Sequence, residues 1–251
     1  MSPGSPGEIP VDFHRIGLLT QRAGQPTQVP FLARLLEPTA LAEVQDIHQE
    51  ALRHVPEPGL VRSDSEAFFA YHFSGEGHTL GVFAEDRLIA YGILSLPAGP
   101  DYGYDRFLED LGLPASEWPR MAQLTGVAVR PEWRGNHLHR RLCAWRLELA
   151  HAVHRWQIAA VSAPGNPCSW RNLLAAGLWI KGIKLLGGQQ LRYLLHADLR
   201  GSPPLDFASA VTVEVSAMTK QRRLLATGYW GYAAVVEKNV QQLRYARPLP
   251  S

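Results

Sequence analysis

A short stretch of this chain combines the residue types that bind an anion. The apolar residues 127–129 are followed by Pro131, Arg134, Gly135 and Asn136. A turn from a strand into a helix directs backbone N–H groups toward one point, because the first helical turn leaves its donors unpaired. Gly135 permits close approach and Asn136 tolerates unusual backbone dihedral angles. This pattern predicts a site for a phosphate or a pyrophosphate.

Positive charge surrounds the same turn. Arg134, Arg140 and Arg141 add to the partial positive charge at the start of a helix. The alternative is the solvated beginning of a basic helix, which needs no ligand. A buried strand directly before the turn favours the anion site, since its edge could hydrogen-bond an extended ligand that carries amide groups.

The spacing of apolar residues predicts alternating strands and helices around the turn. Thr39 is the expected cap of the first helix, and Ser63 or Asp64 that of the second. Gly177 has the position of a residue that ends a helix. The expected strands are 29–36, 78–84, 87–96, 124–129, 158–162, 178–186 and 189–199, and the expected helices begin at 39 and span 64–73, 135–156 and 167–176.

Composition divides the chain into three parts. Residues 1–28 are rich in turn formers and predict a flexible or surface-wrapping arm. Residues 29–199 form the main domain. Residues 200–251 predict an added α/β extension, with a strand at 211–215, a helix at 221–226 and a hairpin of 229–236 with 240–245. The aromatic cluster of Tyr229, Trp230 and Tyr232 is interpreted as core packing rather than as a partner surface.

Bulk properties exclude several classes of protein. Apolar residues make up 46% of the chain, charged residues make up 19%, and the net charge is +2. Such a chain forms a globular core, and neither nucleic acid nor a membrane is an expected partner. Cys143 and Cys168 are too few for a disulfide framework. The start of the sequence lacks the features of a secretory signal, so a cytoplasmic protein is expected.

Two signatures in this order resemble those of the GNAT superfamily of N-acetyltransferases. The first matches that family's strand-turn-helix motif for acyl-CoA at Val129, Pro131, Arg134, Gly135, Leu138 and Leu142. The second, in residues 166–178, resembles the family's Asn, helix and Gly entry into the next strand. The implied fold is α/β, with a mixed central sheet flanked by helices and splayed open between strands 124–130 and 158–162.

The resemblance also implies which residues form the site. Acetyl-CoA, or another acyl-CoA, is the implied co-substrate, and the backbone N–H near Val127 is the implied donor to the thioester oxygen. No metal is implied. The implied coenzyme-binding residues are Val127, Ala128, Val129, Arg134, Gly135, Asn136, His137, Leu138, His139, Arg140, Asn166, Ser169 and Asn172.

The chain departs from the family pattern at three places. His137 and His139 stand where the family has small residues, so their rings narrow the site or contact phosphate themselves. They lack the further ligands that a metal site needs. Leu173 stands where many members carry a tyrosine that acts as a general acid. The signature strand has no carboxylate, so the general base is unassigned.

The loop 98–120 is the candidate for recognition of the acceptor amine. Its carboxylates attract a cation, and its aromatic side chains could form the walls of a pocket. A solvent-exposed helix with ordinary charges is the equal alternative. The candidate substrate residues are Asp101, Tyr102, Tyr104 and Trp118.

The expected function is therefore transfer of an acyl group, acetyl above all, from acyl-CoA to a primary amine by direct attack. The acceptor is a small molecule or a peptide. The alternatives are transfer of a longer acyl chain and a catalytically weak regulatory protein that binds acyl-CoA. The choice between a monomer and a homodimer stays open.

Overall fold

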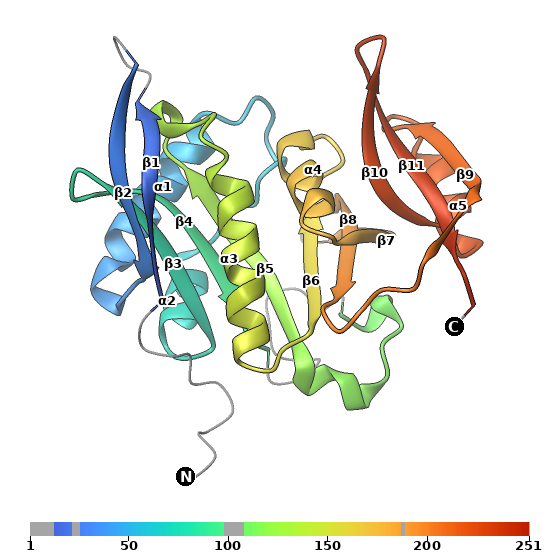
Figure 1. The fold of residues 1–251 in the computed structure, drawn as a ribbon, viewed down its shortest axis with the longest axis horizontal. Helices are drawn as coiled ribbons and strands as arrows, with labels where there is room; N and C mark the ends of the chain where they lie inside the picture. The colour runs from blue at the N-terminus through green and yellow to red at the C-terminus, as the bar shows by residue number, and fades with distance from the viewer. Residues whose placement is uncertain (1–12, 22–25, 98–107, 187–188, 251) are drawn as a thin grey trace.

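The computed structural model describes residues 13–21, 26–97, 108–186 and 189–250. These residues form one mixed sheet of eleven strands in the order β1-β2-β3-β4-β5-β6-β8-β7-β10-β11-β9. Helices α1 and α2 cover one face of the sheet, and α3 and α4 cover the other (Figure 1). None of the helices in the described ranges is long and apolar enough to cross a membrane.

Most predicted elements are confirmed with small changes in their bounds. The strands are β1 His14–Gln21, β2 Thr27–Leu35, β3 Gly77–Ala84, β4 Arg87–Ser95, β5 Met121–Val129, β6 Gln157–Ser162, β7 Trp179–Leu186, β8 Gln190–Asp198, β9 Leu205–Glu214, β10 Trp230–Glu237 and β11 Val240–Pro248. The α-helices are α1 Leu41–Arg53, α2 Glu66–Phe73, α3 Leu138–Ala152, α4 Pro167–Ala175 and α5 Met218–Ala226.

The prediction of an N-terminal arm is wrong for residues 14–21. These residues form β1, which pairs antiparallel with β2 at the edge of the sheet. Within β1 only Leu19 is fully buried, while Ile16 and Leu18 are exposed. Because this edge strand buries little of itself, its sequence lacks the alternation that reveals a half-buried strand.

The helix caps differ from those predicted. Thr39 lies in a short 3₁₀ turn after Pro38, and α1 begins beyond it without a side-chain cap. Helix α2 is capped by Ser65, whose Oγ accepts a hydrogen bond from the Phe68 N–H at 3.2 Å. Both helices still start within a few residues of the expected positions, because apolar spacing fixes a helix more firmly than any one cap.

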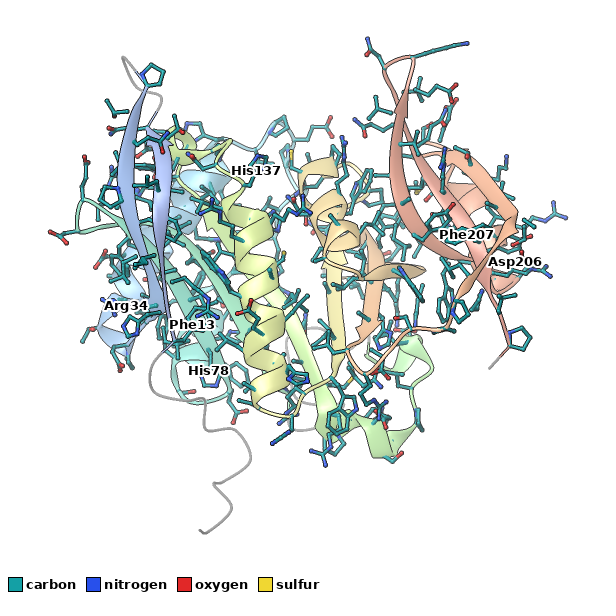
Figure 2. All side chains as sticks on the ribbon, viewed as in Figure 1. Phe13, Arg34, His78, His137, Asp206 and Phe207 are labelled. Atoms are coloured by element: carbon teal, nitrogen blue, oxygen red, sulfur yellow. The ribbon has the colours of Figure 1, made fainter. Side chains whose placement is uncertain are left out.

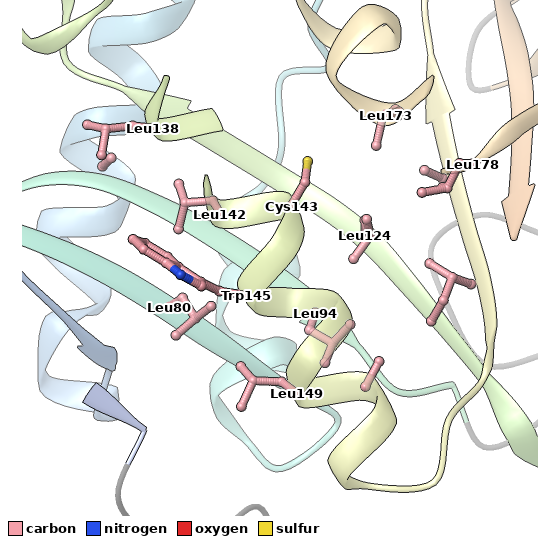
Figure 3. Close-up of a cluster of buried hydrophobic side chains, with 14 of the residues drawn as sticks. Leu80, Leu94, Leu124, Leu138, Leu142, Cys143, Trp145, Leu149, Leu173 and Leu178 are labelled. Atoms are coloured by element: carbon pink, nitrogen blue, oxygen red, sulfur yellow. The ribbon is translucent and has the colours of Figure 1, made fainter. Parts of the chain in front are cut away.

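Helix α3 packs its apolar stripe onto the sheet. Leu142, Trp145 and Leu149 contribute to the main core together with Leu80 and Leu94 (Figure 3). The predicted helix of residues 135–156 is shorter in the structure, because residues 131–137 form the turn that precedes it.

The C-terminal residues extend the central sheet. Strand β10 meets β7 at the pair Gly231 and Ile180. The rings of Trp179 and Trp230 lie 5.1 Å apart, and the ammonium of Lys181 lies 4.0 Å from the Trp230 ring. Tyr232 packs on Phe207 of the same chain, with ring centroids 5.5 Å apart. Trp230 and Tyr232 thus contact side chains of their own chain, but they are half-buried rather than part of the core, and Phe207, labelled in Figure 2, is 65% exposed.

Gln221 of α5 is the buried polar link between the C-terminal residues and the main domain. Its Oε1 accepts hydrogen bonds from Tyr193 Oη at 2.9 Å and Tyr245 Oη at 2.7 Å. Its Nε2 donates to the carbonyl oxygens of Glu214 and Val215. Since Tyr193 belongs to β8, one amide side chain connects both parts of the sheet.

We expect Gln221→Leu to lower the free energy of unfolding by about 3 kcal/mol or more. The substitution removes the acceptor of two buried hydroxyl groups, those of Tyr193 and Tyr245, and each such group costs about 1–3 kcal/mol. Urea unfolding followed by circular dichroism measures the loss. Lys220→Leu, at an exposed position of the same helix, is the control. Equal stability of the two variants would contradict this role of Gln221.

Candidate active site

The parallel strands β5 and β6 separate part of the way along their length. They pair from Met121 with Gln157 to Leu124 with Ala160, and the pairing ends there. Beyond Leu124 the two strands diverge toward the ends from which α3 and α4 begin (Figure 1). A cavity of about 1190 Å³ lies at this opening, lined by residues of both strands and both helices. The implied splay of the sheet is confirmed.

A bulge in β5 lies where the separation begins. The register between β4 and β5 shifts after the pair Ile93 and Thr125, so that Gly126, with φ of 22°, is an extra residue before Val127. The bulge changes the direction of the strand beside the cavity. A side chain at Gly126 would clash, because its Cβ would lie 2.8 Å from the Ile93 side chain.

Arg146 of α3 supports this bulge from within the protein. Its Nη1 donates to the carbonyl oxygens of Ile93 at 2.9 Å and Thr125 at 2.8 Å. The residue is only 1% exposed, and it reaches the strands over Gly92, which has no side chain to block it. Burial lowers the pKa of Arg146, yet an arginine keeps its charge at neutral pH. A buried positive charge therefore lies on the wall of the cavity.

The strand after the bulge presents hydrogen-bonding groups to the opening. The Arg130 N–H donates to the Ile89 carbonyl of β4 at 2.9 Å. Backbone N–H groups point alternately to the two sides of an antiparallel strand. The Ala128 N–H therefore also points toward β4, whereas the N–H groups of Val127 and Val129 point to the opposite edge of β5. That edge is the one that β6 has left. Val127, Ala128 and Val129 all line the cavity.

The turn between β5 and α3 points the start of the helix at the same cavity. Gly135 has a φ of 81° and His137 a φ of 57°, both in the left-handed region. His137, labelled in Figure 2, is the residue before the first helical turn, and its side chain does not cap that turn. The first N–H groups of α3 therefore lack an intrahelical partner. Arg134 and Arg140 are exposed beside them and line the cavity.

The side chain of Asn136 forms hydrogen bonds within the protein. Its side chain donates to the carbonyl oxygens of Thr20 at 2.9 Å and Trp133 at 3.1 Å, and accepts from the Thr20 N–H at 2.7 Å. These bonds attach the turn to β1, and Asn136 is not among the residues that line the cavity. The other twelve predicted coenzyme-binding residues do line it.

Two histidines of the cavity wall are neutral. Burial, together with the nearby Arg146, lowers the pKa of His139 to about 3. Burial and Arg62 lower the pKa of His48 to about 4. The His48 Nε2 accepts the Asp64 N–H at 3.1 Å, so its Nδ1 carries the proton that Tyr91 Oη accepts. The described residues include no group of His, Cys, Asp and Glu side chains that could hold a metal.

Helix α4 forms the other side of the opening. Asn166 caps it, because its Oδ1 accepts the Ser169 N–H at 3.2 Å. Asn172 donates to the Cys168 carbonyl oxygen at 2.6 Å. Leu173, at the position of the family's tyrosine, is buried and lines the cavity. This wall therefore offers no tyrosine hydroxyl at that position to a leaving group.

A second group of residues that line the cavity has no signal in the sequence. It comprises His54, Val55, Pro56, Leu60, Val61, Arg62 and Asp64 before α2, and Lys184, Leu185, Leu186, Gln190 and Arg192 of β7 and β8. We call these residues the acceptor end. They are far apart in the sequence and carry no common motif, so only the three-dimensional fold reveals the cluster.

Of the four predicted substrate residues, Trp118 is the one that lies in the described part of the chain. Asp101, Tyr102 and Tyr104 lie outside the described residues. Trp118 is described, but it is not among the residues that line the cavity. Its neighbour Glu117 accepts hydrogen bonds from Gln157 and Trp156, which lower the pKa of that carboxyl. The described part of the loop therefore attaches to the main domain.

Comparison with known proteins supports the fold. Neither a family model nor a curated protein matches the sequence. Among solved structures, Arabidopsis thaliana NAA60 in complex with acetyl-CoA has a TM-score of 0.53 at 13% identity, over 68% of this chain and 99% of that one. The GNAT domain of S. lividans PAT has a TM-score of 0.51 at 14% identity, over 76% and 100%. The ribosomal-protein-S5-alanine acetyltransferase from Vibrio fischeri has a TM-score of 0.50 at 18% identity, over 69% and 96%.

These likenesses identify the class of fold. This chain has the GNAT acetyltransferase fold.

We expect acid to destabilise the protein through His48 and His139. The unfolded chain takes up a proton at each histidine near pH 6.5, whereas the folded pKa values are about 4 and 3. The unfolded state then binds more protons, so the free energy of unfolding falls as the pH drops below 6.5. We expect each histidine to lower the free energy of unfolding by about 1 kcal/mol between pH 7.5 and pH 5.5.

Urea titrations at the two pH values measure this loss. In the His139→Gln variant, we expect the free energy of unfolding to fall by about 1 kcal/mol less between the two pH values than in the wild type. His151→Gln is the matched control, because His151 is exposed on the same helix. An equal pH dependence in the two variants would show that His139 is not held neutral.

Proposed function

We propose that this protein belongs to the GNAT superfamily and is an N-acyltransferase that uses acyl-CoA, with acetyl-CoA as the preferred donor. The observation that carries the proposal is the meeting of two features at one cavity. They are the open edge of β5 beyond Leu124 and the uncapped start of α3. A pantetheine has amides that suit an open strand edge, and a pyrophosphate suits a helix start.

The residues of the turn fit the diphosphate part of the coenzyme. The N–H groups at the start of α3, Gly135 and the exposed guanidinium groups of Arg134 and Arg140 provide donors and positive charge. His137 lies where the backbone φ is positive, and it adds a ring to this region. Asn136 contributes by fixing the turn to β1 rather than by binding the ligand.

The proposed reaction is direct transfer to a primary amine. The amine nitrogen bonds to the acyl carbon, the carbon–sulfur bond breaks, and the amine loses a proton as the coenzyme leaves as a thiol. The Val127 N–H faces the opening and is the proposed donor to the thioester oxygen as negative charge develops there. The buried charge of Arg146 favours the same development of negative charge.

One observation favours the alternative of a binding protein with little activity. Leu173 gives the leaving thiolate no hydroxyl proton, and both ring nitrogens of His48 are already hydrogen-bonded. Under this alternative the protein binds acetyl-CoA but releases no thiol with any amine. Measurement of thiol release with acetyl-CoA and with longer acyl-CoAs shows which acyl group the protein transfers.

We expect Arg134→Glu to weaken the binding of acetyl-CoA by roughly tenfold or more, because a charge-assisted contact becomes a repulsive one. Isothermal titration calorimetry measures the dissociation constant. The shift in melting temperature with added coenzyme is the second measure. Arg222→Glu, at an exposed position of α5, is the matched control for the change in charge. Binding that is the same in both variants would contradict the proposed coenzyme site.

A further inference from the structure

The four lysines of the chain have different surroundings. They are Lys181, Lys184, Lys220 and Lys238. Lys220 and Lys238 are exposed, and Lys184 forms an ion pair with Asp110. Lys181 of β7 is partly buried and is not among the residues that line the cavity. The proposed acyl transfer therefore gives Lys181 no role.

A bulge in β7 sets the direction of the Lys181 side chain. Ile180 pairs with Leu195 of β8, and Gly182 pairs with Leu194, so Lys181 is an extra residue between the two pairs. An inserted residue of this kind re-aims its side chain relative to a regular strand. The position of Lys181 is thus a specific feature of this part of the sheet.

The amine of Lys181 contacts a neutral histidine. Gln157 Nε2 donates to the carboxylates of Glu117 at 2.8 Å and Asp198 at 2.9 Å, so its Oε1 accepts the Nε2 proton of His196 at 2.7 Å. A neutral imidazole has one N–H, so the His196 Nδ1 accepts a hydrogen bond from the Lys181 Nζ at 2.8 Å. Burial and Lys181 lower the pKa of His196 to about 3, which keeps the ring neutral.

The positive charge of Lys181 is costly at this position. No ion pair between described residues includes Lys181, and the nearby carboxylate of Asp198 is bound by Arg200 at 2.7 Å. The Nζ lies 4.0 Å from the centre of the Trp230 ring. Burial lowers the pKa of Lys181 to about 8, although Asp198 opposes this shift. At pH 8 roughly half of these side chains are neutral, against fewer than about one in a hundred for an ordinary lysine.

We propose that Lys181 is a modification site, at which the amine is acylated directly by acyl-CoA without the coenzyme cavity. The Nζ bonds to the acyl carbon, the carbon–sulfur bond breaks, the amine loses a proton to water and the coenzyme leaves as a thiol. The neutral amine donates to His196 and keeps its lone pair for the acyl carbon. The product is an uncharged amide, so the cation beside Trp230 at the junction of β7 and β10 is lost.

The test measures the acetylation of each lysine in the full chain. The protein is incubated with acetyl-CoA at pH 8, and mass spectrometry of its peptides follows the four lysines over time. We expect Lys181 to react roughly tenfold faster or more than the exposed Lys220 and Lys238, because its larger neutral fraction outweighs the weaker nucleophilicity that comes with a lower pKa. Lys181→Arg removes this signal and leaves the other lysines unchanged. Reaction of Lys181 no faster than that of the exposed lysines would overturn the inference.

A matched pair of variants tests the cause of the reactivity. Trp230→Glu places a carboxylate beside the amine, which favours the charged form of Lys181. Trp230→Gln has a similar shape and no charge. We expect Lys181 to be acetylated roughly tenfold more slowly in Trp230→Glu than in Trp230→Gln. Equal rates in the two folded variants would contradict the inference, and if neither variant folds the rates in the wild type still decide.

The Arg134→Glu variant separates this inference from the proposed function. This substitution is directed at the coenzyme cavity, so we expect it to leave the acetylation rate of Lys181 unchanged. Loss of Lys181 acetylation in this variant would assign the step to the cavity and overturn direct acylation. No thiol release with any added amine and no thermal shift with acetyl-CoA would overturn the proposed function, while faster acetylation of Lys181 would still support the modification site.

Discussion

The separation of β5 from β6 beyond Leu124 is the constraint on which the rest of the site depends. A strand edge buried without a partner leaves polar groups unsatisfied, which costs free energy. β5 meets this cost on one side by its pairing with β4. On the other side the edge faces a cavity rather than packed side chains, so water or a ligand can satisfy it. An extended ligand with amide groups pairs with such an edge as a neighbouring strand would.

The opening needs support that a regular sheet does not. Arg146 donates from α3 to a carbonyl oxygen on each strand beside the bulge at Gly126, that of Thr125 in β5 and that of Ile93 in β4. Arg146 fits because Gly92 leaves space for it. On the other side of the turn, Asn136 binds Thr20 and so uses β1 as a brace. An edge strand with little buried surface of its own thus helps to hold the start of α3 in place.

The sequence predicts the main domain well because its signals are local. Alternating and helical apolar spacing locates the strands and helices, and the turn at residues 134–137 contains its own glycine and charges. Three features have no local signal. β1 is recognisable only by its pairing with β2. In the sequence, Arg146 is one charged residue among the apolar residues of α3, and nothing there indicates its contacts with the strands. The acceptor end requires residues 54–64 to meet residues 184–192.

The charges and dipoles around the cavity bear on the presence of Leu173 where many GNAT members carry a tyrosine. A proton donor at Leu173 would neutralise a leaving thiolate by proton transfer. The cavity instead holds a fixed charge at Arg146, neutral histidines at positions 48 and 139, and a helix start that carries partial positive charge. Fixed charges and dipoles stabilise an anion without a matched pKa. For an acyltransfer of the proposed kind, the charge of Arg146 and the start of α3 stabilise negative charge on the leaving sulfur before the sulfur takes up its proton.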